Sequence, residues 1–372
     1  MKPMTIRPLA SLLVVAVLAG PVRPSAAADG EEAAKGRETY RARVIGVPFA
    51  YYSPETKLAF GGGGVVNFRA GRRKAETRAS SVWAYASYNL ARQFNVMVKP
   101  EITLGGNDLY LGGLVRWERA PQKFFGVGDD MPDEAEETFT PRHLVVELGV
   151  KRRVRGPLFA GLRVDFERTV MEKVEAGGVL DAGDIAGSRG GTLAGVGISL
   201  DWDTRDSVLF PRRGAFAQLT ADAYGPVAGS DYSFNRLVVD LRRYLPLGAS
   251  GVLALQGFVY SSGGDVPFHR LAQAGGEQLL RGYYKGRYRD KAMIAVQGEY
   301  RVLLTKRFGV AGFAGLGDLF PAWAGLRFEK LVHSLGGGLR YVVNKRDGTT
   351  IRLDVAWGRS SFGLYVTAKE AF

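Results

Sequence analysis

The stretch from Leu158 to Glu167, LFAGLRVDFE, decides the fold class. Apolar and charged side chains alternate along it, in the order Leu162, Arg163, Val164, Asp165, Phe166, Glu167. Because successive side chains on a β-strand point to opposite faces, one face of this strand is apolar and the other carries both signs of charge. A strand that crosses a membrane in a barrel has this pattern over about ten residues. We therefore expect an all-β chain that forms a transmembrane antiparallel β-barrel.

The same alternation recurs along the chain, for example in residues 144–153, 236–242 and 351–357. It predicts sixteen strands, an even number, as single-chain bacterial barrels require. The expected strands cover residues 43–52, 57–69, 78–89, 92–104, 108–119, 142–154, 157–170, 192–203, 214–224, 232–245, 251–260, 293–304, 307–317, 331–344, 349–358 and 361–372.

The connections between these strands differ in length in a regular way. The long ones, over 120–141, 171–191, 261–292 and 318–330, all follow odd-numbered strands. Connections after even-numbered strands are mostly tight. Long external loops and short periplasmic turns are typical of outer-membrane barrels. A soluble β-sandwich also alternates apolar and polar residues, but its turn lengths need not follow strand parity.

The first 28 residues form a segment of their own. Lys2 and Arg7 precede the apolar run 9–20, and Ala26-Ala27-Ala28 follows it. This layout predicts a secretory signal peptide over 1–28, cleaved near Ala28. We expect a short periplasmic segment over 29–42, then the barrel over 43–372, in the outer membrane of a Gram-negative bacterium.

The chain is basic and lacks cysteine. Its formal net charge is +13, and removal of Lys2, Arg7 and Arg23 with the signal peptide leaves about +10. The basic residues are interleaved with acidic ones, which disfavours a nucleic-acid partner. Outer-membrane lipid and lipopolysaccharide are the expected partners. The absence of cysteine excludes disulfides and lipoprotein anchoring.

Four motifs carry a family resemblance. Leu280-Arg281-Gly282-Tyr283 resembles the hydrophobic-Arg-Gly-aromatic signature of the bacterial surface antigen superfamily, the outer-membrane assembly barrels of the BamA and TamA type. The other three are the periplasmic turn motif with Asp203, Arg205, Asp206, Pro211 and Gly214, the Phe124-Phe125-Gly126-Val127-Gly128 loop, and the C-terminal Phe372, which resembles the signal read by the barrel assembly machinery.

The resemblance implies that loop 261–292 folds into the lumen. Arg281 would then pack against acidic groups on the twelfth and thirteenth expected strands. Glu299, followed by Arg301, matches the family's acid on the twelfth. The thirteenth usually reads Phe-x-Asp-x-Gly, but here Phe313 and Gly317 flank Gly315. We therefore expect a weaker hold on Arg281, with Asp318 as a partial substitute at the wrong spacing.

The resemblance leaves the function open. Members that assemble proteins usually carry periplasmic POTRA domains before the barrel, and 29–42 is too short for one. We expect a barrel-only member acting in outer-membrane biogenesis, with a client polypeptide or lipid. The alternatives are a passive pore partly plugged by loop 261–292, and an outer-membrane enzyme.

Candidate chemical sites are few. The sequence offers no nucleophile elbow and no Ser–His pair, so we expect no enzymatic activity. His143, His269 and His333 lack metal-ligand spacing. The acidic run from Asp129 to Glu137 lacks the fixed spacing of a calcium loop. We therefore expect no metal and no cofactor.

Overall fold

The computed structural model describes residues 16–17, 42–53, 57–71, 77–90, 92–208, 210–326, 330–344, 349–359 and 361–372. The predicted signal peptide and the segment after it therefore lie outside the described residues, apart from Ala16, Val17 and Ala42. The chain divides into two compact units. Unit 1 comprises residues 1–121 and 142–145, and unit 2 comprises residues 122–141 and 146–372.

Unit 1 is an antiparallel meander in which each strand pairs with the next along the chain. Its strands are β1 (Ala16–Val17), β2 (Arg43–Ser53), β3 (Lys57–Phe68), β4 (Ser80–Asn89), β5 (Phe94–Leu104) and β6 (Leu109–Arg119). The two-residue β1 pairs with β2. On β5 and β6 the rings of Phe94 and Trp117 lie 4.3 Å apart.

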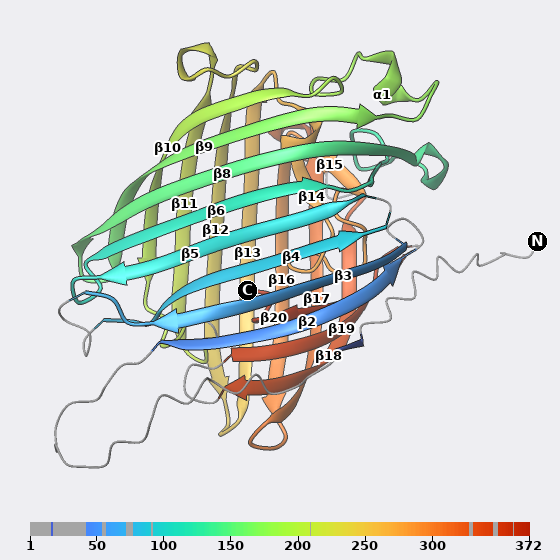
Figure 1. Cartoon of the computed structure of the whole chain (residues 1–372). Coiled ribbons are helices and arrows are strands. Elements are labelled where there is room, and N and C mark those ends of the chain that lie inside the picture. Colours follow the sequence, from blue (N-terminus) through green and yellow to red (C-terminus); the bar gives the residue numbers. More distant parts are fainter. Residues whose placement is uncertain are drawn as a thin grey trace, which may run out of the picture. The chain divides into compact units, whose positions relative to one another are not determined.

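Unit 2 holds the remaining strands (Figure 1). The long strands are β8 (Glu137–Arg155, of which Arg142–Val145 belong to unit 1), β9 (Leu158–Lys173), β10 (Gly191–Asp203), β11 (Gly214–Tyr224), β12 (Phe234–Leu247), β13 (Gly251–Gly264), β16 (Ala292–Leu303), β17 (Phe308–Phe320), β18 (Val332–Asn344), β19 (Thr349–Trp357) and β20 (Phe362–Ala368). The short strands are β7 (Gln122–Phe124), β14 (Ala272–Ala274) and β15 (Tyr288–Asp290). From β9 onward each long strand pairs antiparallel with the next long strand, so that β13 pairs with β16. The short strands β14 and β15 pair with each other.

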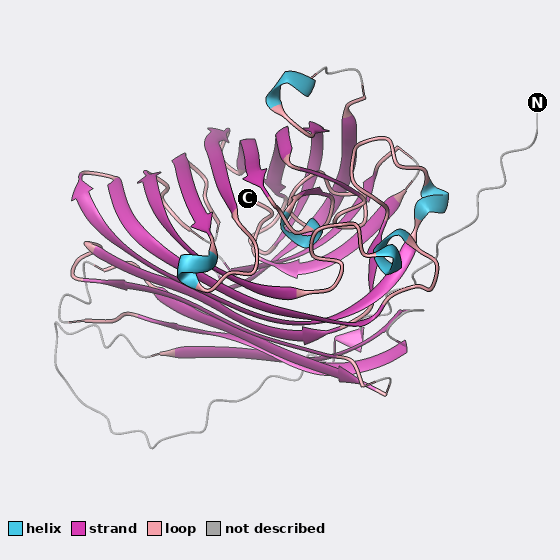
Figure 2. Cartoon of the chain, turned by 90° about the horizontal axis from the view of Figure 1, so that it is seen from above, coloured by secondary structure: helices cyan, strands magenta, loops and turns pink. Residues whose placement is uncertain are grey.

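In the part of the chain that the structure describes, helical structure is confined to short turns (Figure 2). They are α1 (Val179–Ala182), η1 (Asp133–Ala135), η2 (Pro226–Ala228), η3 (Phe268–Arg270) and η4 (Trp323–Gly325). Among the described residues, no helix is long and apolar enough to cross a membrane.

The strand prediction is confirmed: each of the sixteen expected segments coincides with one long strand. Several boundaries differ by a few residues; β8, for example, begins at Glu137 rather than at residue 142. The last strand was expected to reach residue 372, but β20 ends at Ala368. Lys369 follows in the left-handed region, with φ +75°, and this conformation turns the chain away from the strand direction.

In the unit 2 sheet, apolar side chains are exposed on one face and charged side chains are buried on the other, the opposite of the pattern in a soluble protein. On β9, Leu162 is 65% exposed, whereas Asp165 is 4% exposed. Leu241 on β12 and Leu335 on β18 are likewise exposed, while Glu299 on β16 is fully buried. Charged residues are rarely buried unless they are paired, and an exposed apolar face suits contact with lipid. Below, the charged face is called the inner face and the apolar one the outer face.

The segment between β13 and β16 (265–291) packs against the inner face of unit 2. Two clusters of buried apolar side chains form around it, one with Leu280 and Tyr283 and the other with Val266, Phe268 and Leu271. The segment makes few backbone pairs with the long strands, so its position depends on side-chain contacts.

Candidate functional site

The backbone at the Leu280-Arg281-Gly282 motif turns sharply toward the inner face. Leu280 has φ +52° and Gly282 has φ +115°. A Cβ atom on Gly282 would lie 2.6 Å from the carbonyl carbon of Trp357, so only glycine lets the loop approach the end of β19 this closely. This turn directs Arg281, which is 1% exposed, onto the strands.

Arg281 bridges two carboxylates on different strands. Its Nη2 donates to Glu299 on β16 at 2.5 Å, and its Nη1 donates to Asp354 on β19 at 2.6 Å. The guanidinium also lies over the ring of Phe313 on β17, with Cζ 3.4 Å from the centroid. The planar, forked guanidinium satisfies two acids and one ring at once, which the point charge of a lysine cannot do.

Further buried ion pairs surround this bridge. Arg301 donates to Glu299 at 2.8 Å, and Arg352 pairs with Asp354 at 2.5 Å. Arg340 reaches three acids: Glu299 at 2.8 Å, Asp354 at 2.5 Å and Glu370 at 3.0 Å. We call these residues the Arg281 cluster, which consists of Arg281, Arg301, Arg340, Arg352, Glu299, Asp354 and Glu370. The alternating charges make the loop contact part of a larger network.

Asp354 takes the place expected for an acid on β17, and no motif in the sequence predicted this role. The weaker hold expected from Gly315, with Asp318 as substitute, is wrong, since the second acid comes from β19. Gly315 instead makes room for the loop. A Cβ atom there would lie 3.1 Å from Leu280 Cδ2. The alternation in 351–357 predicts that Asp354 lies on the charged face. Alternation along one strand does not predict which residue elsewhere in the chain will contact Asp354.

Gly317 makes similar room, which leads to a prediction. A Cβ atom at Gly317 would lie 2.7 Å from Leu280 Cδ1, and Leu280 is fully buried. We expect Gly317→Ala to displace Leu280 and to cost about 1–3 kcal/mol of stability, as overpacked cores do. Thermal unfolding followed by heat-modifiable gel migration measures this. Gly312→Ala on the same strand is the control, because its Cβ atom would meet nothing within 4 Å. Equal unfolding temperatures for the two variants would contradict the packing role.

Tyr283 fixes the loop to β18 and to the segment after β19. Its hydroxyl donates to the carbonyl of His333 at 2.7 Å and accepts from the backbone N–H of Arg359 at 2.8 Å. Gly282 is held at both backbone groups: its N–H donates to Tyr365 at 2.9 Å, and its carbonyl accepts from Ser361 at 2.8 Å. Each motif residue therefore has its own contact with the strands.

A second arginine, Arg270, holds the other end of the loop. Its Nη1 and Nη2 each donate to Asp165 on β9 at 3.1 Å, and its Nε donates to Glu167 at 2.7 Å. The hydroxyl of Tyr224 on β11 also donates to Asp165, at 2.6 Å. Arg270 was not among the predicted site residues. The alternation on 158–167 marked its two partners, but no local signal marked the arginine.

The loop also contacts the acidic segment before β8. Arg287 pairs with Asp133 at 2.7 Å and lies over the ring of Phe125, 4.8 Å from the centroid. Burial lowers the pKa of Arg289 to about 10, and its guanidinium donates to backbone carbonyls such as that of Gly286 at 3.1 Å. The Phe124–Gly128 motif thus supplies part of the loop's packing surface.

The acidic run 129–137 is used in ion pairs and capping. Glu136 pairs with Lys123 at 2.8 Å, and Glu137 accepts from the backbone N–H groups of Val179 and Leu180 at the start of α1. Within the described residues no group of three or more His, Cys, Asp or Glu side chains is arranged to hold a metal ion.

The periplasmic turn motif forms a separate, self-contained structure between β10 and β11. Asp203 accepts from the side chain of Arg205 at 2.9 Å. Asp206 accepts from the backbone N–H groups of Arg212 and Arg213, at 3.0 and 3.3 Å. Pro211 is buried, and Gly214 has φ +104° with no space for a Cβ atom beside the carbonyl of Thr204. These contacts shape the turn and do not reach the Arg281 cluster.

The C-terminal residues turn onto the inner face. Phe372 is 4% exposed and packs with Tyr244, Val252 and Ala254. Its carbonyl oxygen accepts from Arg301 Nη2 at 3.0 Å. The structure therefore connects Phe372 to the Arg281 cluster, which no sequence motif predicts. Recognition of Phe372 by the assembly machinery stays a prediction.

The comparisons with known proteins agree with this geometry. Residues 182–357 match the family model described as the Omp85 superfamily domain. BamA from Haemophilus ducreyi, in a crystal structure lacking POTRA domains 1–3, is similar with a TM-score of 0.59 and 14% identity, over 90% of this chain and 71% of that one. No curated protein sequence matches the chain.

Two CdiB structures are also similar. CdiB from Acinetobacter baumannii has a TM-score of 0.54 at 9% identity, over 88% of this chain and 58% of its own. CdiB from Escherichia coli has a TM-score of 0.55 at 10% identity, over 89% and 62%. The chain thus spans less than two thirds of either CdiB, and at these identities the likeness shows the fold alone. The family match and the shared fold agree with the resemblance seen at Arg281: residues 182–357 of this chain match the Omp85 superfamily domain.

Proposed function

We propose that this protein acts in outer-membrane biogenesis, as a barrel that inserts or translocates a client polypeptide or lipid while the 265–291 loop restricts its interior. The observation that carries the proposal is the attachment of the loop to the inner face through two buried arginines, Arg281 and Arg270. A loop held by buried ion pairs on three strands is costly to displace and suits a regulated passage.

The charge distribution on the inner face also supports the passage of a client polypeptide or lipid over the passage of small ions. Acids and arginines form compensated groups, such as Arg236 with Asp222 at 2.8 Å and Arg242 with Asp240 at 2.5 Å. A face in which charges neutralise one another does not select strongly for one sign of small ion. We propose no enzymatic step and no cofactor.

Depletion of the protein tests the role in biogenesis. We expect loss of the chain to lower the amount of at least one other outer-membrane protein or lipid species, measured by quantitative proteomics and lipid analysis of purified outer membranes. Complementation with the Arg281→Ala variant, compared with wild type at equal folded level, links the effect to the loop. An unchanged outer membrane after full depletion would overturn the proposal.

The second candidate is a passive pore with the loop as its constriction. Single-channel recording of the full chain in planar bilayers separates the two. We expect low or brief conductance from the wild-type protein, because the loop occupies the inner face. A steady, open conductance would favour the pore.

A further inference from the structure

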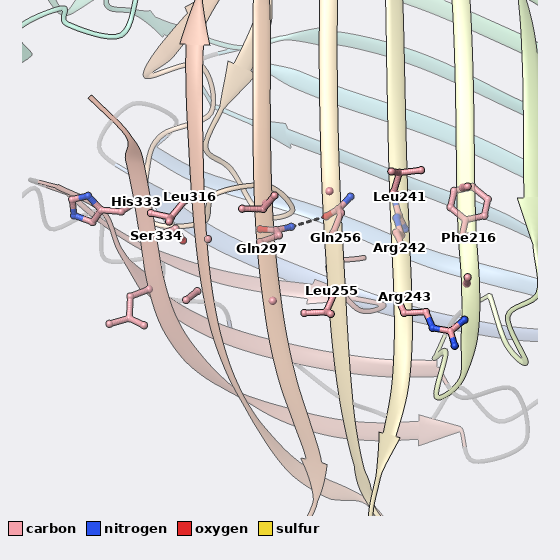
Figure 3. Close-up of a pocket in the computed structure, with 18 residues that line it drawn as sticks. Phe216, Leu241, Arg242, Arg243, Leu255, Gln256, Gln297, Leu316, His333 and Ser334 are labelled. Atoms are coloured by element: carbon pink, nitrogen blue, oxygen red, sulfur yellow. Dashed lines mark hydrogen bonds between the residues drawn. The ribbon is translucent and has the colours of Figure 1, made fainter. Parts of the chain in front are cut away.

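The outer face of unit 2 contains an apolar hollow of about 970 Å³ across β11 to β18. The hollow is lined by exposed apolar side chains from neighbouring strands. These are Leu241, Leu255, Val296, Leu316 and Leu335. Figure 3 shows three of these leucines, Leu241 on β12, Leu255 on β13 and Leu316 on β17. An outer face in lipid needs only to be apolar, so a hollow of this size requires a separate explanation.

The hollow exists because small residues lie between the large ones in the strand register. Gly257 on β13 is paired with Leu241 on β12 and with Val296 on β16. Gly298 on β16 is paired with Leu255 on one side and Ala314 on the other. A Cβ atom added to Gly257 would meet nothing within 4 Å. The space beside Gly257 is therefore open, and a slender apolar chain fits along it.

The hollow is separate from the Arg281 cluster. The intervening side chains point to the inner face, where Gln256 donates to Asp240 at 2.8 Å and Gln297 donates to Gln256 at 2.7 Å. Leu280 covers the inner side of the same sheet at Gly315. An occupant of the hollow would thus contact the outer face only.

Two arginines line the hollow, Arg242 and Arg243, and Arg242 pairs with Asp240 on the inner face. Arg243 on β12 is exposed, and within the described part of the chain no carboxylate pairs with it. It lies cross-strand from Leu255 and near the end of β12, on the side of the tight hairpin turns. Those turns carry further exposed basic residues, Arg155, Lys306 and Arg307. Basic residues at a membrane surface attract anionic lipid headgroups.

We propose that this hollow binds one anionic phospholipid, with an acyl chain along Gly257 and its phosphate at Arg243. The leaflet is the one that meets the tight turns, because Arg243 lies toward that end of the strands. The apolar wall provides contact for the chain, and the unpaired guanidinium provides the matching charge for the headgroup. This inference rests on the membrane fold and does not depend on what the loop does.

Native mass spectrometry of the purified full chain tests the site. The protein, in a neutral detergent, is titrated with phosphatidylglycerol and separately with phosphatidylcholine of the same acyl chains. We expect one phosphatidylglycerol to bind in preference to phosphatidylcholine. Gly257→Leu should abolish this binding by filling the hollow. Arg243→Gln should weaken it about fivefold and remove the headgroup preference.

Matched variants separate the site from general effects. Gly46→Leu on β2 makes the same substitution at an exposed glycine whose Cβ atom also meets nothing within 4 Å, and it should bind as wild type does. Arg155→Gln removes an exposed arginine that does not line the hollow. Ala314→Leu fills the hollow from β17 and replaces Gly257→Leu if that variant fails to fold.

Several outcomes would overturn the proposal. Wild-type binding by a folded variant with a filled hollow would show that the lipid lies elsewhere. Equal weakening by Arg155→Gln and Arg243→Gln would assign the effect to the diffuse charge of the turns. Equal binding of the two lipids by the wild type would remove the role of Arg243.

Discussion

Replacing Glu299 with glutamine is expected to destabilise the protein by about 3–5 kcal/mol, the usual effect of removing one partner from a buried ion pair. Glu299 is fully buried and accepts from Arg281, Arg301 and Arg340. Glutamine keeps the shape of the side chain and removes the charge. The four buried arginines of the Arg281 cluster would then share only its two remaining acids, Asp354 and Glu370.

The temperature at which heat-modifiable gel migration changes to that of the unfolded chain measures this loss. The control is Lys330→Gln, which removes an exposed ion pair with Asp130. Exposed pairs are worth about 0–1 kcal/mol, so the control should unfold close to the wild-type temperature. A Glu299→Gln variant as stable as Lys330→Gln would mean that the Arg281 cluster does not contribute to stability.

The sequence predicted the strands well because each carries its own local signal. The alternation on β9 and on β19 depends only on residues within one strand, and the parity of loop lengths depends only on strand order. Neither signal requires knowledge of which strands face the loop. The sixteen long strands were therefore all predicted, with errors of a few residues at their ends.

The site was predicted less completely, because its contacts are distant in sequence. Arg281 and Glu299 carried recognisable motifs, but Asp354 lies 73 residues beyond Arg281, and Arg270 lies 105 residues beyond Asp165. No periodicity links such positions. The path of residues 369–372 was not predicted either. The left-handed φ of Lys369 and the burial of Phe372 depend on the surface that Arg301 and Tyr244 provide.

The structure suggests that the loop is held at two independent points. Arg281 is bound to β16 and β19, and Arg270 is bound to β9. Their partners are different carboxylates on different strands, and among the residues that the structure describes no ion pair joins the two groups. Effects of mutations at sites without shared partners usually add. Release of the loop should therefore require the loss of both attachments.

The double variant Arg270→Ala/Arg281→Ala is accordingly expected to open the protein to ions, with a single-channel conductance several-fold above that of wild type. Each substitution removes one partner from buried carboxylates, at a cost of about 3–5 kcal/mol, and together they remove the arginine ion pairs that attach the loop to β9, β16 and β19. Each single variant should show only brief openings, because the other arginine still holds its end.

Arg281→Lys in the Arg270→Ala background is the matched control. Lysine keeps the positive charge but cannot bridge Glu299 and Asp354 while lying over Phe313, so intermediate conductance is expected. If charge alone held the loop, this variant would stay as closed as Arg270→Ala. If the double variant remained closed while folded, the loop would be held by its apolar contacts, such as those of Leu280 and Phe268, and the arginines would serve stability rather than closure.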